Sequence, residues 1–227
     1  FGETDSTTGE WKIKTDVSAT MGTNGFQVLK DGNGITDTST NSNNFSSGGG
    51  TLTNTEDCPS NVFATINPID NVQDNAPFAN GNTTWSTSSS SHYFWGRSTI
   101  GVSSGKYYFE AKLSSASSFN HIGICDRAPE DATTTLESET YGWGYKNSDG
   151  KVYNNGSSVS YGNTFTTGDI LGVALDLDNN RLFFSKNGTW QNSGDPTSST
   201  GAITITAPSS TSTGNYFFVV SDNASGD

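Results

Sequence analysis

The chain has 227 residues, and its 23 acidic against 11 basic side chains give a formal net charge of −12. This charge argues against nucleic acid and membrane as partners, because a protein that binds phosphates or anionic headgroups neutralises them with Lys and Arg. No run of 18 apolar residues is present, so no segment is expected to span a membrane. The length suits one large β-sandwich, or one sandwich with a smaller appendage.

The first 57 residues are predicted to form short strands and polar connectors. Residues 10–14 and 25–30 alternate apolar and polar side chains, which predicts two short strands. The tract at 36–49 is almost entirely polar or glycine, so it predicts a loop or extended connector. Because the chain begins at Phe1, we expect residues 1–57 to be the end of an upstream module or connector of a longer polypeptide.

Residues 58–227 are predicted to form an all-β domain. No stretch in them has the 3.6-residue apolar period of a helix. The acidic segment at 126–140 predicts a loop with at most one helical turn. The early strands are expected at 62–66, at 83–87, and at 92–95 running into 98–102, and a later strand is expected at 121–125.

Residues 161–190 give the clearest pattern. Between 170 and 177, leucine and valine alternate with small or polar residues, a period of two that indicates a strand with one buried face. Turn residues follow at 178–180, then a second strand at 181–185 and the hairpin signal at 187–188. The segment therefore predicts an antiparallel β-meander. Its expected core residues are Leu171, Val173, Leu175 and Leu177.

Five ordered motifs resemble the SPRY domain family. They are SGKYYFE at 104–110, HIGI at 121–124, YGWGY at 141–145, GDILGVALDLD at 168–178 and FSKNG at 184–188. The resemblance covers residues 90–220. It implies a concanavalin-like jelly-roll sandwich of two antiparallel sheets, which binds partners through loops at one end of the sheets.

The N-terminal third is similar to a different class of protein. The segments FGETDSTTGEWK, GTNGF and NVFATINPID resemble segments that recur in large virion fibre proteins of tailed bacteriophages. This resemblance implies an extracellular virion location, with other virion subunits as partners. It also implies a homo-oligomer, because subunits of such fibres are usually trimers.

The SPRY resemblance places a candidate ligand-binding rim on seven residues. Aromatic rings that stack on a sugar, and charged side chains that bond pairs of hydroxyls, would suit a saccharide. Tyr and Trp are also favoured anchors in protein interfaces. The alternative for the three aromatics of YGWGY is the sandwich core, because alternation with glycine puts all three rings on one face. The rim residues are Tyr141, Trp143, Tyr145, Asp126, Arg127, Trp95 and Arg97.

No catalytic, metal or cofactor site is predicted. His92 and His121 lack the setting of a nucleophile or metal site, and the common hydrolase and nucleotide-binding motifs are absent. A glycosidase on this fold needs two carboxylates on one face, and Glu110 stands alone on its strand. The oxygen-rich turns at 126–131 and 176–180 lack the spacing of a Ca²⁺ site.

Cys58 and Cys125 are the only two cysteines. A bridge between them would stabilise the fold by roughly 4 kcal/mol in the chain-entropy model. Two buried thiols are the alternative, since Cys125 ends a predicted strand and free cysteine is often buried.

The sequence favours a non-enzymatic virion appendage module of fibre or adhesin type. The module would present its sandwich to a glycan or protein of the host surface. Three alternatives stay open: a purely structural or decorating virion domain, an intracellular SPRY adaptor that binds a peptide, and a polysaccharide-degrading sandwich.

Overall fold

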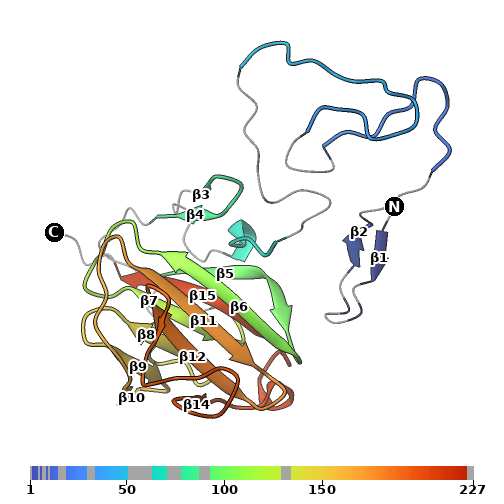
Figure 1. Cartoon of the computed structure of the whole chain (residues 1–227). Coiled ribbons are helices and arrows are strands. Elements are labelled where there is room, and N and C mark those ends of the chain that lie inside the picture. Colours follow the sequence, from blue (N-terminus) through green and yellow to red (C-terminus); the bar gives the residue numbers. More distant parts are fainter. Residues whose placement is uncertain are drawn as a thin grey trace. The chain divides into compact units, whose positions relative to one another are not determined.

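The computed structural model describes residues 2–4, 6, 9, 11–14, 19–29, 34–50, 63–70, 78–86, 93–128 and 134–223. The chain divides into two compact units, residues 1–64 and 65–227, whose elements are drawn in Figure 1. The predicted division between residues 57 and 58 lies outside the described residues.

The described part of the first unit contains one strand pair. β1 (Gly2–Thr4) pairs antiparallel with β2 (Trp11–Ile13), which confirms the strand predicted at 10–14. The strand predicted at 25–30 is wrong for residues 25–29, which form no regular structure.

The carboxylate of Asp37 organises this part of the chain instead. It is buried and accepts hydrogen bonds from the main-chain N–H groups of Gln27 (2.8 Å), Ser39 (2.8 Å) and Asn43 (2.7 Å). Burial raises the pKa of Asp37, but the hydrogen bonds outweigh it and lower that pKa to about 2. The N–H of Gln27 therefore bonds to a side chain rather than to a neighbouring strand.

The second unit is a sandwich of two antiparallel sheets, as predicted (Figure 1). The six-stranded sheet has the order β10 (Ser157–Ser160), β9 (Lys151–Asn154), β8 (Gly142–Lys146), β7 (His121–Cys125), β15 (Tyr216–Asn223) and β5 (Tyr93–Val102). The second sheet has the order β13 (Thr189–Trp190), β12 (Arg181–Lys186), β11 (Ile170–Asp176) and β6 (Lys106–Lys112), with β14 (Ile203–Thr204) also paired to β12. The remaining elements are the pair β3 (Phe78–Ala79) and β4 (Thr84–Trp85) and the 3₁₀ turns η1 (Pro68–Asp70) and η2 (Pro208–Ser210).

The turns of the predicted meander are also found. Asn180 has a φ of 53° in the turn between β11 and β12, and Asn187 and Gly188, with φ values of 48° and 77°, join β12 to β13. Asparagine and glycine tolerate this left-handed backbone better than other residues, which explains why they stand at these corners.

The early strands differ in part from the prediction. The segment predicted at 92–95 runs into that at 98–102 as expected and forms β5, and the segment at 83–87 contains β4. The strand predicted at 62–66 is wrong for its described residues, because only Ile66 forms a bridge, with Ser98. Pro68 has no N–H to extend a ladder and begins η1 instead.

The core lies between the two sheets. Tyr145 of β8 lies with its ring centroid 5.3 Å from those of Phe165 and Phe184, so aromatic rings fill much of this space. Each such buried side chain contributes roughly 1.5–3 kcal/mol to stability. The core residues predicted from the meander are all buried, which confirms the prediction: Leu171, Val173, Leu175 and Leu177.

The described part of the loop between β7 and β8 packs on the outer face of the six-stranded sheet. Leu136 of this loop packs in a second cluster with Trp95, Cys125 and Val219. A Cβ at Gly144 would come within 2.8 Å of Cδ2 of Leu136, so the glycine makes room for the loop. Cys125 is a free thiol whose pKa is raised by burial, and Cys58 lies outside the described residues.

Candidate functional site

Most of the aromatic rim predicted from the sequence lies in the core. Tyr145 is fully buried, Trp143 is 5% exposed and Trp95 is 3% exposed. Tyr145 also donates its hydroxyl to the carbonyl of Asn163, and Tyr141 is half-buried against the core. The alternative interpretation of YGWGY, rings packed between the sheets, therefore describes this strand, and a binding site has to be sought elsewhere.

The charged members of the predicted rim hold loops in place. Buried Asp126 accepts a hydrogen bond from the N–H of Ser212 (2.9 Å), which ties down the segment after η2. Arg97 forms an ion pair with Asp70 of η1, and its guanidinium lies 4.3 Å from the ring centroid of Phe217. These contacts use Asp126 and Arg97 within the fold.

Arg127 is the more exposed member of this charged group. Its side chain is 42% exposed, and Nε lies 3.8 Å from Oε2 of Glu139. The seven predicted rim residues therefore do not converge on one surface as a ligand site.

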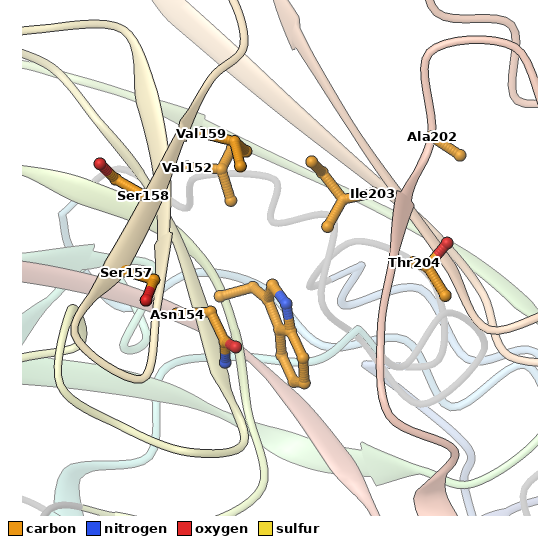
Figure 2. Close-up of a pocket in the computed structure, with 9 residues that line it drawn as sticks. Val152, Asn154, Ser157, Ser158, Val159, Ala202, Ile203 and Thr204 are labelled. Carbon is orange, nitrogen blue, oxygen red and sulfur yellow. The ribbon is translucent and has the colours of Figure 1, made fainter.

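A cleft opens instead at one edge of the sandwich, and we call it the edge cleft (Figure 2). Its volume is about 320 Å³. One wall comes from the six-stranded sheet and the other from the segment around β14, and Figure 2 shows Val152 and Val159 on one side and Ile203 on the other. The lining residues are Trp143, Val152, Asn154, Ser157, Ser158, Val159, Ala202, Ile203 and Thr204.

The hairpin of β9 and β10 builds the first wall. Asn155 and Gly156, with φ values of 49° and 72°, form a two-residue turn in which both residues have the left-handed backbone of a type I′ hairpin. The register places Val152 opposite Val159, so both side chains point to the same face of the sheet. Val152 is buried in the core, whereas Val159 is 52% exposed at the mouth of the cleft.

The second wall is held by the other sheet. Ile203 of β14 pairs with Leu182 of β12, which is fully buried in the core. The cleft therefore lies where the two sheets end, β10 being the edge strand of one sheet and β14 an outer strand of the other. Its walls continue the apolar interior of the sandwich toward the surface.

The chemistry of the edge cleft suits an uncharged group. No lining residue carries an ionisable side chain, and the polar members offer hydroxyl and amide groups. The side-chain amide of Asn154 already donates to the carbonyls of Thr140 (3.0 Å) and Gly142 (2.9 Å). Trp143 exposes only 5% of its surface, which is too little for a sugar ring to stack on.

A charged cluster lies on the outer face of the same sheet. Oε1 of Glu137 is 3.0 Å from Nε2 of His121 and accepts a hydrogen bond from Nζ of Lys146 (2.7 Å). The hydrogen bond with His121 and the contact with Lys146 outweigh burial and lower the pKa of Glu137 to about 2. Lys146 also lies 4.6 Å from the ring centroid of Phe119, so its charge is already paired on two sides.

The described residues offer little for catalysis. Glu110, the carboxylate considered for a glycosidase, accepts a hydrogen bond from the hydroxyl of Tyr108 (2.6 Å) on the exposed face of β6. Within the described ranges, no three His, Cys, Asp or Glu side chains gather as a metal site would require. In the same ranges no helix has the length and apolar character needed to cross a membrane.

Comparisons with known proteins place a SPRY domain in the sandwich. Residues 106–207 match the family model of the SPRY domain. The crystal structure of the SPRY domain of human HERC1 has a TM-score of 0.52 at 19% identity, covering 71% of this chain and 91% of that one, which shows a shared fold.

Two relatives match by sequence over a shorter stretch. Ran-binding protein 9 of Danio rerio is 36% identical over 91 residues, which are 39% of this chain and 15% of that protein. The ATP-dependent RNA helicase DDX1 of Xenopus laevis is 37% identical over 94 residues, 40% of this chain and 12% of that protein. The match thus spans a small part of each relative. Both are vertebrate proteins and give no support to the predicted bacteriophage fibre role, which stays a prediction.

Residues 106–207 of the β-sandwich are, by the family match and the shared fold, a SPRY domain.

Proposed function

We propose that this chain is a non-enzymatic recognition module that binds a protein partner through the edge cleft of its SPRY sandwich. The observation that carries the proposal is the uncharged, largely apolar lining of a cleft that stays open at the sandwich edge. An apolar side chain of a partner that enters the cleft removes Val159 and itself from water, which contributes roughly 1.5–3 kcal/mol.

Two further observations support a protein over a glycan. The lining has one aromatic ring, and that ring is buried, so the stacking surface that a saccharide needs is missing from the cleft. One relative with a matching stretch is named as a Ran-binding protein.

The test selects peptides that bind the whole chain from a display library of random sequences. The selected peptides are expected to share one large apolar residue. Val159→Asp places a charge at the cleft mouth and should weaken their binding by about tenfold or more. Ile170→Asp is the matched control, because Ile170 is 40% exposed on the other sheet and does not line the cleft. Equal loss with both variants, or no loss with Val159→Asp, would refute the proposal.

A second candidate is the virion appendage predicted from the N-terminal third. Only the resemblance of the segments at 1–12, 22–26 and 61–70 favours it. It would place the chain on the outside of a particle, in a trimer, with a host-surface glycan or protein as ligand. Immunogold labelling of particles with an antibody against this chain tests the location, and unlabelled particles would remove this candidate.

A further inference from the structure

The edge cleft is bordered by β10, a strand with one hydrogen-bonding edge that faces away from β9. Among the described residues β10 pairs with one strand, β9, and ends the six-stranded sheet. All four of its residues are exposed. An exposed strand edge carries main-chain N–H and C=O groups that another strand can bond.

The register shows which groups of β10 do not bond to β9. Ser157 and Asn154 flank the two-residue turn, and such a flanking pair exchanges main-chain hydrogen bonds. Bonded and non-bonded pairs alternate along an antiparallel ladder, and the next bonded position after β10 is seen at Tyr161, whose N–H donates to the carbonyl of Gly150 (3.2 Å). The N–H and C=O groups of Ser158 and Ser160 therefore point away from β9.

β10 therefore offers a partner two kinds of contact, one through a side chain and one through its main chain. Val159 faces the cleft, on the same side of the sheet as Val152. Its two neighbours present main-chain donors and acceptors along the rim. A chain segment that pairs with the rim has its alternate side chains on the cleft side, at the usual strand spacing of about 4.8 Å from β10.

We propose that the partner binds as an extended segment that adds a strand to β10, antiparallel like the other pairs of this sheet, with one apolar side chain anchored in the edge cleft. This inference rests on the proposed function and specifies how the partner is held. The anchor residue lies opposite Val159, and the residues before and after the anchor exchange main-chain hydrogen bonds with Ser158 and Ser160.

Charge limits the sequence of this segment. The anchor is uncharged, because the cleft lining has no ionisable side chain that could pair with a charge. The chain as a whole carries a net charge of −12, so Lys or Arg on the flanks of the segment is favoured by the long-range potential. The partner segment is therefore apolar at its centre and basic at its flanks.

Amide hydrogen exchange of the whole chain tests the strand pairing directly. The probe is the tightest peptide selected in the display experiment. Exchange of the Ser158 and Ser160 amides should slow by about tenfold or more when the peptide is saturating. The amides of Ser157 and Val159 serve as internal controls, because their ladder with β9 exists before the peptide binds.

N-methylation of the peptide main chain is the second measurement. A methyl group on the residue before or after the anchor removes a donor aimed at β10 and should weaken binding by about tenfold or more. The same change on the anchor residue, whose N–H points away from β10, should leave the affinity nearly unchanged. Unchanged exchange at Ser158 and Ser160, or an N-methylation scan without alternation, overturns the strand-addition inference.

The outcomes separate this inference from the proposed function. Suppose that Val159→Asp weakens the binding of a peptide, and that this peptide leaves the amides of Ser158 and Ser160 unprotected. The peptide then binds the cleft by its side chain alone, which supports the proposed function and overturns the strand addition. Sedimentation of the free chain at rising concentration tests a second copy of this chain as the occupant. A dimer that protects the amides of Ser158 and Ser160 without peptide would also overturn the inference.

Discussion

Replacement of Gly144 by alanine is expected to destabilise the sandwich by about 1–3 kcal/mol. The added Cβ would lie 2.8 Å from Cδ2 and 3.1 Å from Cγ of Leu136, and 3.2 Å from Cδ2 of His121. Leu136 is 1% exposed and His121 is 6% exposed, so neither side chain can move aside without uncovering the sheet. The φ of Gly144 is not positive, so the cost comes from the contact and not from backbone strain.

A double-mutant cycle isolates that contact. Leu136→Ala alone should cost about 2–5 kcal/mol, because it leaves a cavity over the sheet. The alanine at position 144 occupies part of that cavity, so the double variant should be less destabilised than the sum of the two single variants, by about 1–3 kcal/mol. Urea unfolding followed by tryptophan fluorescence measures all four proteins. Additive effects within about 0.5 kcal/mol would refute the packing of this loop on Gly144.

Three further predictions concern other parts of the second unit. The pKa of Glu137 is lowered from 4.5 to about 2, so its ionised carboxylate stabilises the fold above pH 4.5. This stabilisation is lost as the pH falls toward 2. Glu137→Gln should therefore flatten the pH dependence of the urea midpoint in this range, and an unchanged slope would contradict the pairing with His121. Gly156 has a φ of 72°, so Gly156→Ala should lower the free energy of unfolding by roughly 1–2 kcal/mol and weaken peptide binding. An intact affinity would show that the hairpin does not shape the cleft. Asp126→Ala should cost about 1–3 kcal/mol and speed amide exchange at Ser212, whereas unchanged exchange would rule out the hydrogen bond between them.

The fold could be predicted from the sequence because its pattern is local. Alternation from 170 to 177 and the Asx-Gly corners specify strands and turns without reference to distant residues. The strands predicted at 25–30 and 62–66 failed because their main chain bonds to distant groups, such as the carboxylate of Asp37 in the first case. A period-two pattern does not show whether a partner strand exists.

Most aromatic rings of the predicted rim are buried, for a reason that the sequence pattern does not show. In YGWGY the alternation fixes that the rings share one face, but it does not say which face is covered. Leu136, about half a dozen residues earlier, decides this by packing on the glycine face, which leaves the rings to the core between the sheets. That contact depends on how the loop folds back, and no local pattern in the acidic segment indicates it.

The edge cleft was not predicted because the sequence of β10 resembles that of a loop. NNGSSVS is rich in Ser, Asn and Gly, and one valine among them gives no apolar period. The signal that could have found it is the Asn155-Gly156 pair, followed by an isolated valine at hairpin spacing from Val152. An apolar residue that stands alone in a polar hairpin is a candidate for contact with a partner.

A partner of the edge cleft needs both the apolar anchor site and the main-chain groups of β10. β10 offers outward main-chain groups at only two residues, and each hydrogen bond contributes about 0.5–1.5 kcal/mol net. Association costs roughly 4–15 kcal/mol in lost freedom. The four bonds of these two residues contribute roughly 2–6 kcal/mol together, which offsets at most the low end of that cost. A short serine-rich edge therefore resists unspecific pairing. An apolar anchor alone meets the same cost and lacks the register that the main-chain bonds supply. Loss of either the anchor site at Val159 or one main-chain bond at Ser158 should therefore weaken binding by about tenfold or more.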